Sequence, residues 1–116
     1  MAFTPVWTEE AEANYMNLQA AAIASLRNRE KNAKAKPSKA EGLFKQLEKC
    51  IRFLLENPRH PSLNTHEYHS IEHPYDKKQK VFEAYVQNRT PGAYRVFWCY
   101  GPLKGEITLI AITPHP

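Results

Sequence analysis

The chain has 116 residues, of which 42% are hydrophobic and 24% are charged, and its formal net charge is +4 at pH 7. This length predicts one domain over residues 1–116 with one hydrophobic core. No apolar run approaches the roughly 20 residues of a membrane helix, and the first residues lack the basic-then-apolar layout of a secretory signal, so we expect a cytoplasmic protein with no membrane partner. The positive charge favours an acidic partner such as nucleic acid or an acidic peptide.

The first third of the chain predicts a strand and a helix. Residues 3–7 have the character of a short opening strand. Thr8 follows as a helix N-cap, because its hydroxyl can accept hydrogen bonds from the unpaired amides of a first turn. We expect the helix to span residues 8–28, since apolar side chains recur there at helical spacing, namely Ala11, Tyr15, Leu18, Ala22 and Leu26.

A basic run separates this helix from a second one. The run consists of Arg27, Arg29, Lys31, Lys34, Lys36 and Lys39. It is either a solvated linker or a surface that contacts RNA phosphates. Ser38 and Glu41 then have the spacing of a capping box, which starts a helix. An apolar stripe follows, formed by Leu43, Phe44, Leu47, Cys50, Ile51, Leu54 and Leu55, and Asn57-Pro58 ends the helix.

Residues 59–80 hold four of the five histidines and predict a loop with one short strand near residues 65–69. The spacing of His66, His69 and His73 is compatible with zinc ligation. The segment offers no cysteine and predicts no helix to align the rings, so we expect no metal and no other cofactor. The two cysteines, Cys50 and Cys99, lie in apolar segments and are expected to be buried free thiols.

The last third of the chain predicts three strands, at residues 81–88, 93–100 and 106–113. Loops at residues 89–92 and 101–105 join them, and the apolar content of the final strand favours a central position in the sheet. The order β-α-α-β-β-β predicts an α+β fold, in which a two-helix hairpin packs on a mostly antiparallel four-stranded sheet.

Four segments carry a resemblance to a known family. They are residues 3–11, an opening strand that runs into a capped helix; residues 54–58, where a helix ends before a loop; residues 93–98; and residues 110–115, a hydrophobic strand ending in histidine. In this order they resemble the RelE/ParE superfamily of bacterial toxins from type II toxin–antitoxin systems. The likeness covers almost the whole chain except the Lys/Ala-rich stretch between the helices.

This resemblance implies a RelE-like toxin that acts as a metal-independent endoribonuclease. Ribonuclease members of the family cut messenger RNA in the ribosomal A site, where the ribose 2′-OH attacks the adjacent phosphate and leaves a 2′,3′-cyclic phosphate. That chemistry needs a base near the 2′-OH, a cation at the phosphate and an acid for the leaving 5′-oxygen. The implied partners are messenger RNA, the ribosome and a cognate antitoxin protein.

Arg95 is the first catalytic candidate, because the resemblance places it where the family carries an arginine that touches the scissile phosphate. A guanidinium is permanently charged and can bind two phosphate oxygens at once. Strand alternation puts Arg95 on the same face as Ala93 and Phe97. The structural alternative for this side chain is a salt bridge to Glu83 or Glu106 across the sheet.

His115 is the second catalytic candidate. Several ribonuclease members of the family carry a histidine after the last strand, and imidazole can exchange protons near neutral pH. The alternative is a frayed terminus, since His115 is the next-to-last residue.

His66 and Glu83 complete the catalytic candidates. Either His66 or Glu67 lies where some family members place a base, and on a strand these two would point to opposite faces. Glu83 shares a strand face with Tyr85, whose ring could stack on a nucleobase. Exposed loop histidines and a solvated strand face are the structural alternatives. The substrate-binding candidates are Tyr85, Arg89 and Arg59.

Two further functions remain open at this point. ParE-like members bind DNA gyrase and need no catalytic groups, and a relative with the same fold can lack toxicity altogether. Few cations besides Arg89 and Arg95 occur in the β-rich third, which departs from the pattern of the active ribonucleases.

Overall fold

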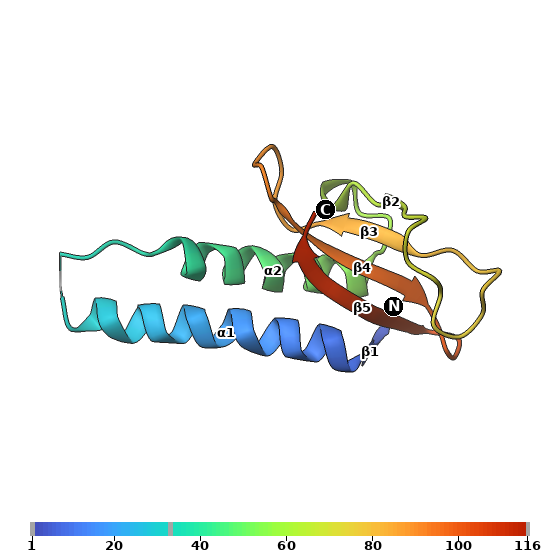
Figure 1. The fold of residues 1–116 in the computed structure, drawn as a ribbon, viewed down its shortest axis with the longest axis horizontal. Helices are drawn as coiled ribbons and strands as arrows, with labels where there is room; N and C mark the ends of the chain where they lie inside the picture. Colours follow the sequence, from blue (N-terminus) through green and yellow to red (C-terminus); the bar gives the residue numbers. More distant parts are fainter. Residues whose placement is uncertain (1, 33, 116) are drawn as a thin grey trace.

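The computed structural model describes residues 2–32 and 34–115, and it has two long helices on one side of a five-stranded sheet (Figure 1). The elements follow in the order β1 (Thr4–Trp7), α1 (Glu9–Glu30), α2 (Lys39–Glu56), a 3-10 helix (Pro61–Leu63), β2 (His66–Glu67), β3 (Phe82–Tyr85), β4 (Tyr94–Tyr100) and β5 (Glu106–Pro114). The predicted α+β class and the helical hairpin are confirmed.

The strands are hydrogen-bonded in the order β1-β5-β4-β3-β2. Strand β1 runs parallel to β5, and all other neighbours are antiparallel. The sheet therefore has five strands where four were predicted, because the two residues of β2 pair with β3 at the edge. The predicted central position of the last strand is confirmed, since β5 lies between β1 and β4 and is not an edge strand.

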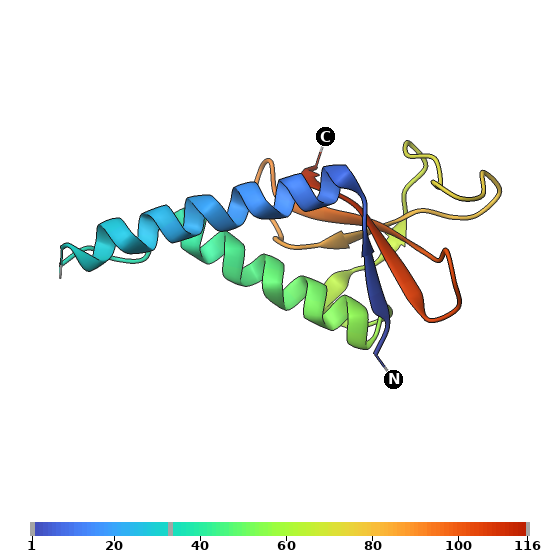
Figure 2. The same ribbon diagram turned by 90° about the horizontal axis from the view of Figure 1, so that it is seen from below.

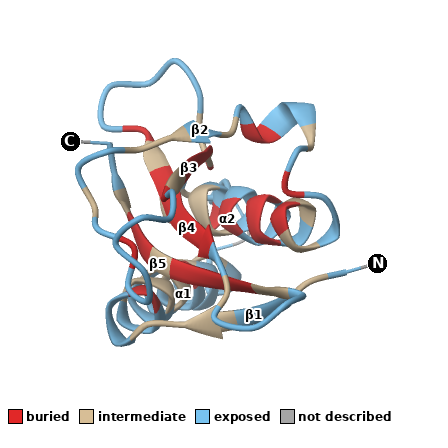
Figure 3. Cartoon of the chain, turned by 90° about the vertical axis from the view of Figure 1, so that its right-hand side faces the viewer, coloured by how far each residue is buried: buried red, intermediate tan, exposed pale blue. Residues whose placement is uncertain are grey.

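The helices begin where their caps predicted. The Thr8 hydroxyl accepts from the amide of Ala11, and Ser38 and Glu41 form the full capping box. One face of α2 is buried against the sheet through Leu47, Cys50, Ile51 and Leu54. The sheet meets this face with Val96, Trp98 and Leu109, so the core lies between the two layers, and Figure 3 shows these buried segments in red.

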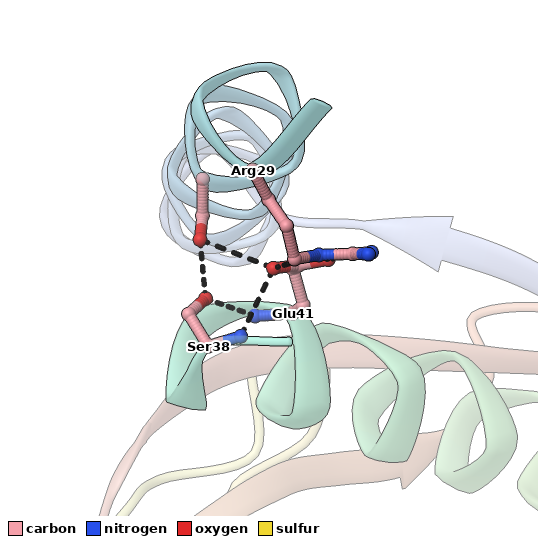
Figure 4. A network of polar contacts seen from close by, with 4 residues as sticks. Arg29, Ser38 and Glu41 are labelled. Atoms are coloured by element: carbon pink, nitrogen blue, oxygen red, sulfur yellow. Dashed lines mark hydrogen bonds and ion pairs between the residues drawn. The ribbon is translucent and has the colours of Figure 1, made fainter. Parts of the chain in front are cut away.

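The helical hairpin extends well beyond the sheet, as Figures 1 and 2 show, and gives the molecule extents of 52 × 26 × 25 Å. Near its tip, Glu41 accepts hydrogen bonds from the Nε and Nη2 of Arg29, from the backbone amide of Ser38 and from the hydroxyl of Ser25 (Figure 4). These donors, with Arg29 first, lower the pKa of Glu41 to about 2. One cation of the predicted basic run thus fastens α1 to α2.

Strands β2 and β3 are shorter than predicted. The strand expected over residues 81–88 spans only Phe82–Tyr85. The amides of Val86 and Gln87 both donate to the carbonyl of Tyr94, and the regular strand ends before them. Cys50 and Cys99 are buried free thiols as predicted, and burial raises the pKa of Cys50 to about 12 and that of Cys99 to about 11. In the part of the chain that the structure describes, neither helix combines the length and apolarity needed to cross a membrane.

Candidate functional site

The face of the sheet opposite the helices carries a polar cluster, which we name the Glu83 cluster: His66, Glu83, Arg95 and His115. Strand alternation explains its position, since Ala84, Val96 and Trp98 face the helical core while their neighbours face the other way. The register sets Glu83 opposite His66 of β2, and Arg95 opposite Tyr85 of β3. Four segments far apart in sequence therefore converge on one face of the sheet.

Glu83 is the centre of this cluster and is 1% exposed. Its Oε1 lies 2.7 Å from Nε2 of His66, its Oε2 lies 3.1 Å from Nδ1 of His115, and Nε of Arg95 lies 3.9 Å from Oε1. A buried carboxylate is stable only when charged or hydrogen-bonding partners compensate for its lost hydration. Both oxygens of Glu83 are engaged by histidines, and the guanidinium of Arg95 adds a permanent positive charge beside them.

The contacts of His66 fix where its protons lie. Nδ1 is 2.9 Å from the carbonyl oxygen of Asn64, which can only accept, so Nδ1 carries a hydrogen. Nε2 lies 2.7 Å from Oε1 of Glu83. Both ring nitrogens are therefore engaged within the chain, although about half of the side chain is exposed.

His115 differs from His66 in this respect. Its Nδ1 donates to Glu83, and no hydrogen bond to its Nε2 is found within the described residues. Its backbone amide donates to the carbonyl of Ala93 at 2.8 Å, which continues the ladder beyond β5. The expectation of a frayed terminus is therefore wrong for His115, and the half-exposed ring is oriented by a carboxylate with its Nε2 available to a ligand.

Arg95 is 8% exposed and lies over the ring of Tyr85, with Cζ 3.6 Å from the ring centroid. Its Nη1 donates to the carbonyls of Gln87 at 2.6 Å and Tyr94 at 3.1 Å. Its Nε is buried and has no hydrogen-bond partner among the described residues. Of the two alternative salt bridges, the one to Glu83 is present as a long contact, while the carboxylate of Glu106 accepts from the amide of Leu103 instead.

Two hollows share His66 in their lining, and each is also lined by one of the two arginines predicted to bind substrate. A hollow of about 430 Å³ is lined by Arg59, Phe82 and Tyr100 as well as His66. A more open hollow on the other side is lined by His66, Tyr85 and Arg89. Arg59 and Arg89 therefore share a hollow with His66 only, and neither makes a polar contact with the carboxylate of Glu83 in the described part of the chain.

The other loop residues do not join the cluster. Glu67 points to the opposite side of β2 from His66 and lies 3.8 Å from Lys80 and 3.7 Å from His69. His73 instead holds the loop in place, because its Nδ1 accepts from the amides of Tyr75 and Asp76 and its Nε2 contacts the carbonyl of Tyr100. Across residues 2–32 and 34–115, no group of three or more His, Cys, Asp and Glu side chains is arranged to hold a metal ion.

Sequence analysis did not identify the contributions of Asn64 and Gln87. Both act through their backbone carbonyls, which orient His66 and Arg95 respectively. A backbone carbonyl has no side-chain signature, and only the turn geometry after each residue brings it to the site. Chemically, the cluster offers one oriented imidazole with a free nitrogen, a buried carboxylate and a guanidinium fixed by stacking.

The comparisons with known proteins agree with this architecture. No protein-family model and no curated protein matches the sequence. Among solved structures, a YoeB/ParE toxin from Agrobacterium tumefaciens superposes with a TM-score of 0.60 at 12% identity, over 97% of this chain and 99% of that one. The structure of the YoeB dimer from Staphylococcus aureus gives a TM-score of 0.57 at 8% identity, with 100% of both chains covered. The chain therefore has the RelE/ParE-like toxin fold.

Proposed function

We propose that this protein is the toxin of a type II toxin–antitoxin system and that it cleaves messenger RNA at the ribosome without a metal. The observation that carries the proposal is the convergence of an oriented, half-exposed histidine, a buried carboxylate and an arginine on one face of a RelE/ParE-like fold. These are the group types that transfer of the 2′-oxygen to phosphorus requires.

In the proposed reaction the 2′-OH loses its proton as its oxygen bonds to phosphorus, and the bond to the 5′-oxygen breaks. The products are a 2′,3′-cyclic phosphate and a 5′-OH end. His115 protonates the leaving 5′-oxygen through Nε2, since Nε2 is the ring atom left free, and Glu83 stabilises the imidazolium that donates this proton. His66 is the candidate base, and it acts after one of its two ring contacts is released.

Arg95 neutralises the phosphate in this mechanism. Stacking on Tyr85 and two carbonyl contacts hold the guanidinium in one orientation, so little reorganisation is needed when negative charge develops on the phosphoryl oxygens. Arg59 and Arg89 bind phosphates on either side of the scissile one, through a longer-range electrostatic attraction.

An antitoxin is the expected protein partner. A ribonuclease of this kind damages its own cell unless a partner restrains it, and the solved structures with this fold are described as YoeB or YoeB/ParE toxins. We propose that the antitoxin covers the face that carries the Glu83 cluster and blocks access of RNA to His115.

The experiment that tests this function is inducible expression in bacteria, with growth and the 5′ ends of cellular messenger RNA as readouts. The expected result is growth arrest with cuts in phase with codons, both abolished by Arg95→Ala. Arrest with intact messages would overturn the ribonuclease proposal and favour a ParE-like inhibitor of DNA gyrase. Undisturbed growth at verified expression would indicate a relative without toxicity.

A further inference from the structure

Three aromatic rings line the hollow of about 430 Å³ that also includes Arg59 and His66, and we name it the aromatic hollow. The rings belong to Phe82, Trp98 and Tyr100. Phe82 is stacked on Trp98 with ring centroids 4.8 Å apart, and Tyr100 packs edge-on against Trp98 at 5.0 Å. Trp98 is buried, whereas Tyr100 is 41% exposed. The inner rings therefore hold Tyr100 in place, and part of its surface stays available to a ligand.

The wall opposite these rings is the loop that follows α2, and hydrogen bonds within the loop fix its shape. The hydroxyl of Thr65 donates to the carbonyl of Pro58 at 3.0 Å, and both residues line the hollow. The amide of Arg59 donates to the side-chain oxygen of Asn57 at 3.1 Å. The volume is within the roughly 300–1,000 Å³ of ordinary ligand pockets. Because the wall is already ordered, a ligand would lose little affinity to conformational ordering.

The charge of the aromatic hollow is positive. Arg59 is exposed and makes no ion pair with the rest of the described chain. No Asp or Glu contributes to the lining within residues 2–32 and 34–115. Aromatic rings favour a flat ligand that can stack on them, and a guanidinium favours a phosphate. A nucleotide combines both groups, whereas an apolar peptide side chain would leave Arg59 unpaired.

We propose that the aromatic hollow binds the base of the RNA nucleotide that carries the attacking 2′-OH, with the 5′ phosphate of that nucleotide on Arg59. The placement rests on the proposed function, in which His66 is the base that serves the 2′-OH. His66 belongs to both the hollow and the Glu83 cluster, so the nucleotide beside the hollow is the one upstream of the cut. Tyr100 supplies the stacking surface, since one face of Tyr85 is covered by Arg95.

Binding of the four nucleoside 5′-monophosphates to the full chain tests the hollow without ribosomes. In a Trp7→Phe chain, Trp98 is the one remaining tryptophan, and its emission should change saturably. Tyr100→Leu should weaken binding at least about fivefold because the stacking surface is lost, while Tyr100→Phe should stay within about twofold. Arg59→Gln should weaken binding of the monophosphates but not of the nucleosides. Arg52→Gln, an exposed arginine outside the hollow, is the control.

Cleavage of messages on programmed ribosomes tests which nucleotide occupies the hollow. Tyr100→Leu should lower kcat/KM at least about fivefold on an intact message. On a message with an abasic nucleotide upstream of the mapped cut, the same change should have no further effect, because no base remains to stack. An abasic nucleotide downstream of the cut should leave the effect of Tyr100→Leu intact. An equal loss on the message that is abasic upstream would overturn the placement.

The two experiments separate this proposal from the ribonuclease function. Cleavage without nucleotide binding, and without an effect of Tyr100→Leu, would overturn the hollow as a base site while the ribonuclease function stands. That result would leave the hollow to an apolar side chain of a protein partner. Nucleotide binding without cleavage would overturn the ribonuclease function and, with it, the placement of the upstream base.

Discussion

Two carboxylates in this chain are buried beside an arginine, and the two sites differ in how completely their hydrogen bonds are closed. Glu41 receives two nitrogens of Arg29, the Ser38 amide and the Ser25 hydroxyl, so each partner is used within the chain. Glu83 is more deeply buried, yet Nε of Arg95 stays unpaired and His115 keeps a free ring nitrogen. A closed network fastens two helices, whereas an incompletely closed one retains donors and acceptors for a ligand.

The largest expected effect separates the two arginines. Arg95→Ala should reduce the rate of messenger RNA cleavage by about a hundredfold to a thousandfold, because one preorganised donor to the reacting phosphate is worth about 2.7–4 kcal/mol. Arg29→Ala, as the matched control, should leave the rate within about twofold. Cleavage is measured on programmed ribosomes, with circular dichroism to verify folding. Equal losses in both variants would mean that the comparison reflects stability alone.

The next effect distinguishes the two histidines of the Glu83 cluster. His115→Gln should lower the cleavage rate by about a hundredfold, at the lower end of what general acid–base groups contribute, because glutamine cannot transfer a proton. His66→Gln should cost less, since both nitrogens of His66 are already engaged within the chain. The pH–rate profile gives a second readout: its limb assigned to the acid should disappear in His115→Gln only. Disappearance of that limb in His66→Gln instead would reverse the assigned roles.

At the Glu41 site the expected effect is on stability and not on activity. Ser38→Ala removes the N-cap of α2 and one partner of the network, and it should lower the free energy of unfolding by about 1 kcal/mol. Urea denaturation measures this change, and Ser70→Ala, an exposed loop serine, is the control. A loss of cleavage activity in Ser38→Ala at unchanged folding would contradict a purely structural role.

The same network predicts how stability depends on pH. Arg29, with help from the Ser38 amide, lowers the pKa of Glu41 from its ordinary value of 4.5 to about 2. The unfolded chain therefore binds a proton at this group before the folded chain does, and the stabilisation present above pH 4.5 is lost as the pH falls toward 2. Glu41→Gln should show a smaller decrease in unfolding free energy between pH 5 and pH 2. Identical pH profiles would show that other groups dominate acid unfolding.

The smallest expected effect concerns the arginines outside the Glu83 cluster. Arg89→Ala should weaken RNA binding modestly. It should also reduce the slope of the logarithm of the binding constant against the logarithm of the salt concentration by about one, because one phosphate contact is lost. Arg95→Ala, by contrast, should affect the rate more than the affinity. Binding to a short uncleavable RNA, followed by fluorescence anisotropy across a salt series, measures both. An unchanged slope would remove Arg89 from the RNA path.

Much of the candidate site was predictable because strand alternation is a local property. The sequence indicated that Glu83 and Tyr85 share a face and that Arg95 shares one with Phe97, and the register confirms both. The pairing of His66 with Glu83 could not be predicted, since it depends on a two-residue strand that has no periodicity of its own. Sequence gave no means to choose between the catalytic and the salt-bridge interpretation of Arg95, because both require the same neighbour.

By itself the sequence determined the helices, their caps, the longer strands along the chain and the side chains available for chemistry, because each of these depends on spacing within a few residues. Only the tertiary structure decided which histidine keeps a free nitrogen and which arginine is closed in a network. These properties arise from contacts between residues far apart in the chain, such as His115 with Glu83 and Arg29 with Glu41. Their geometry follows from how the layers pack.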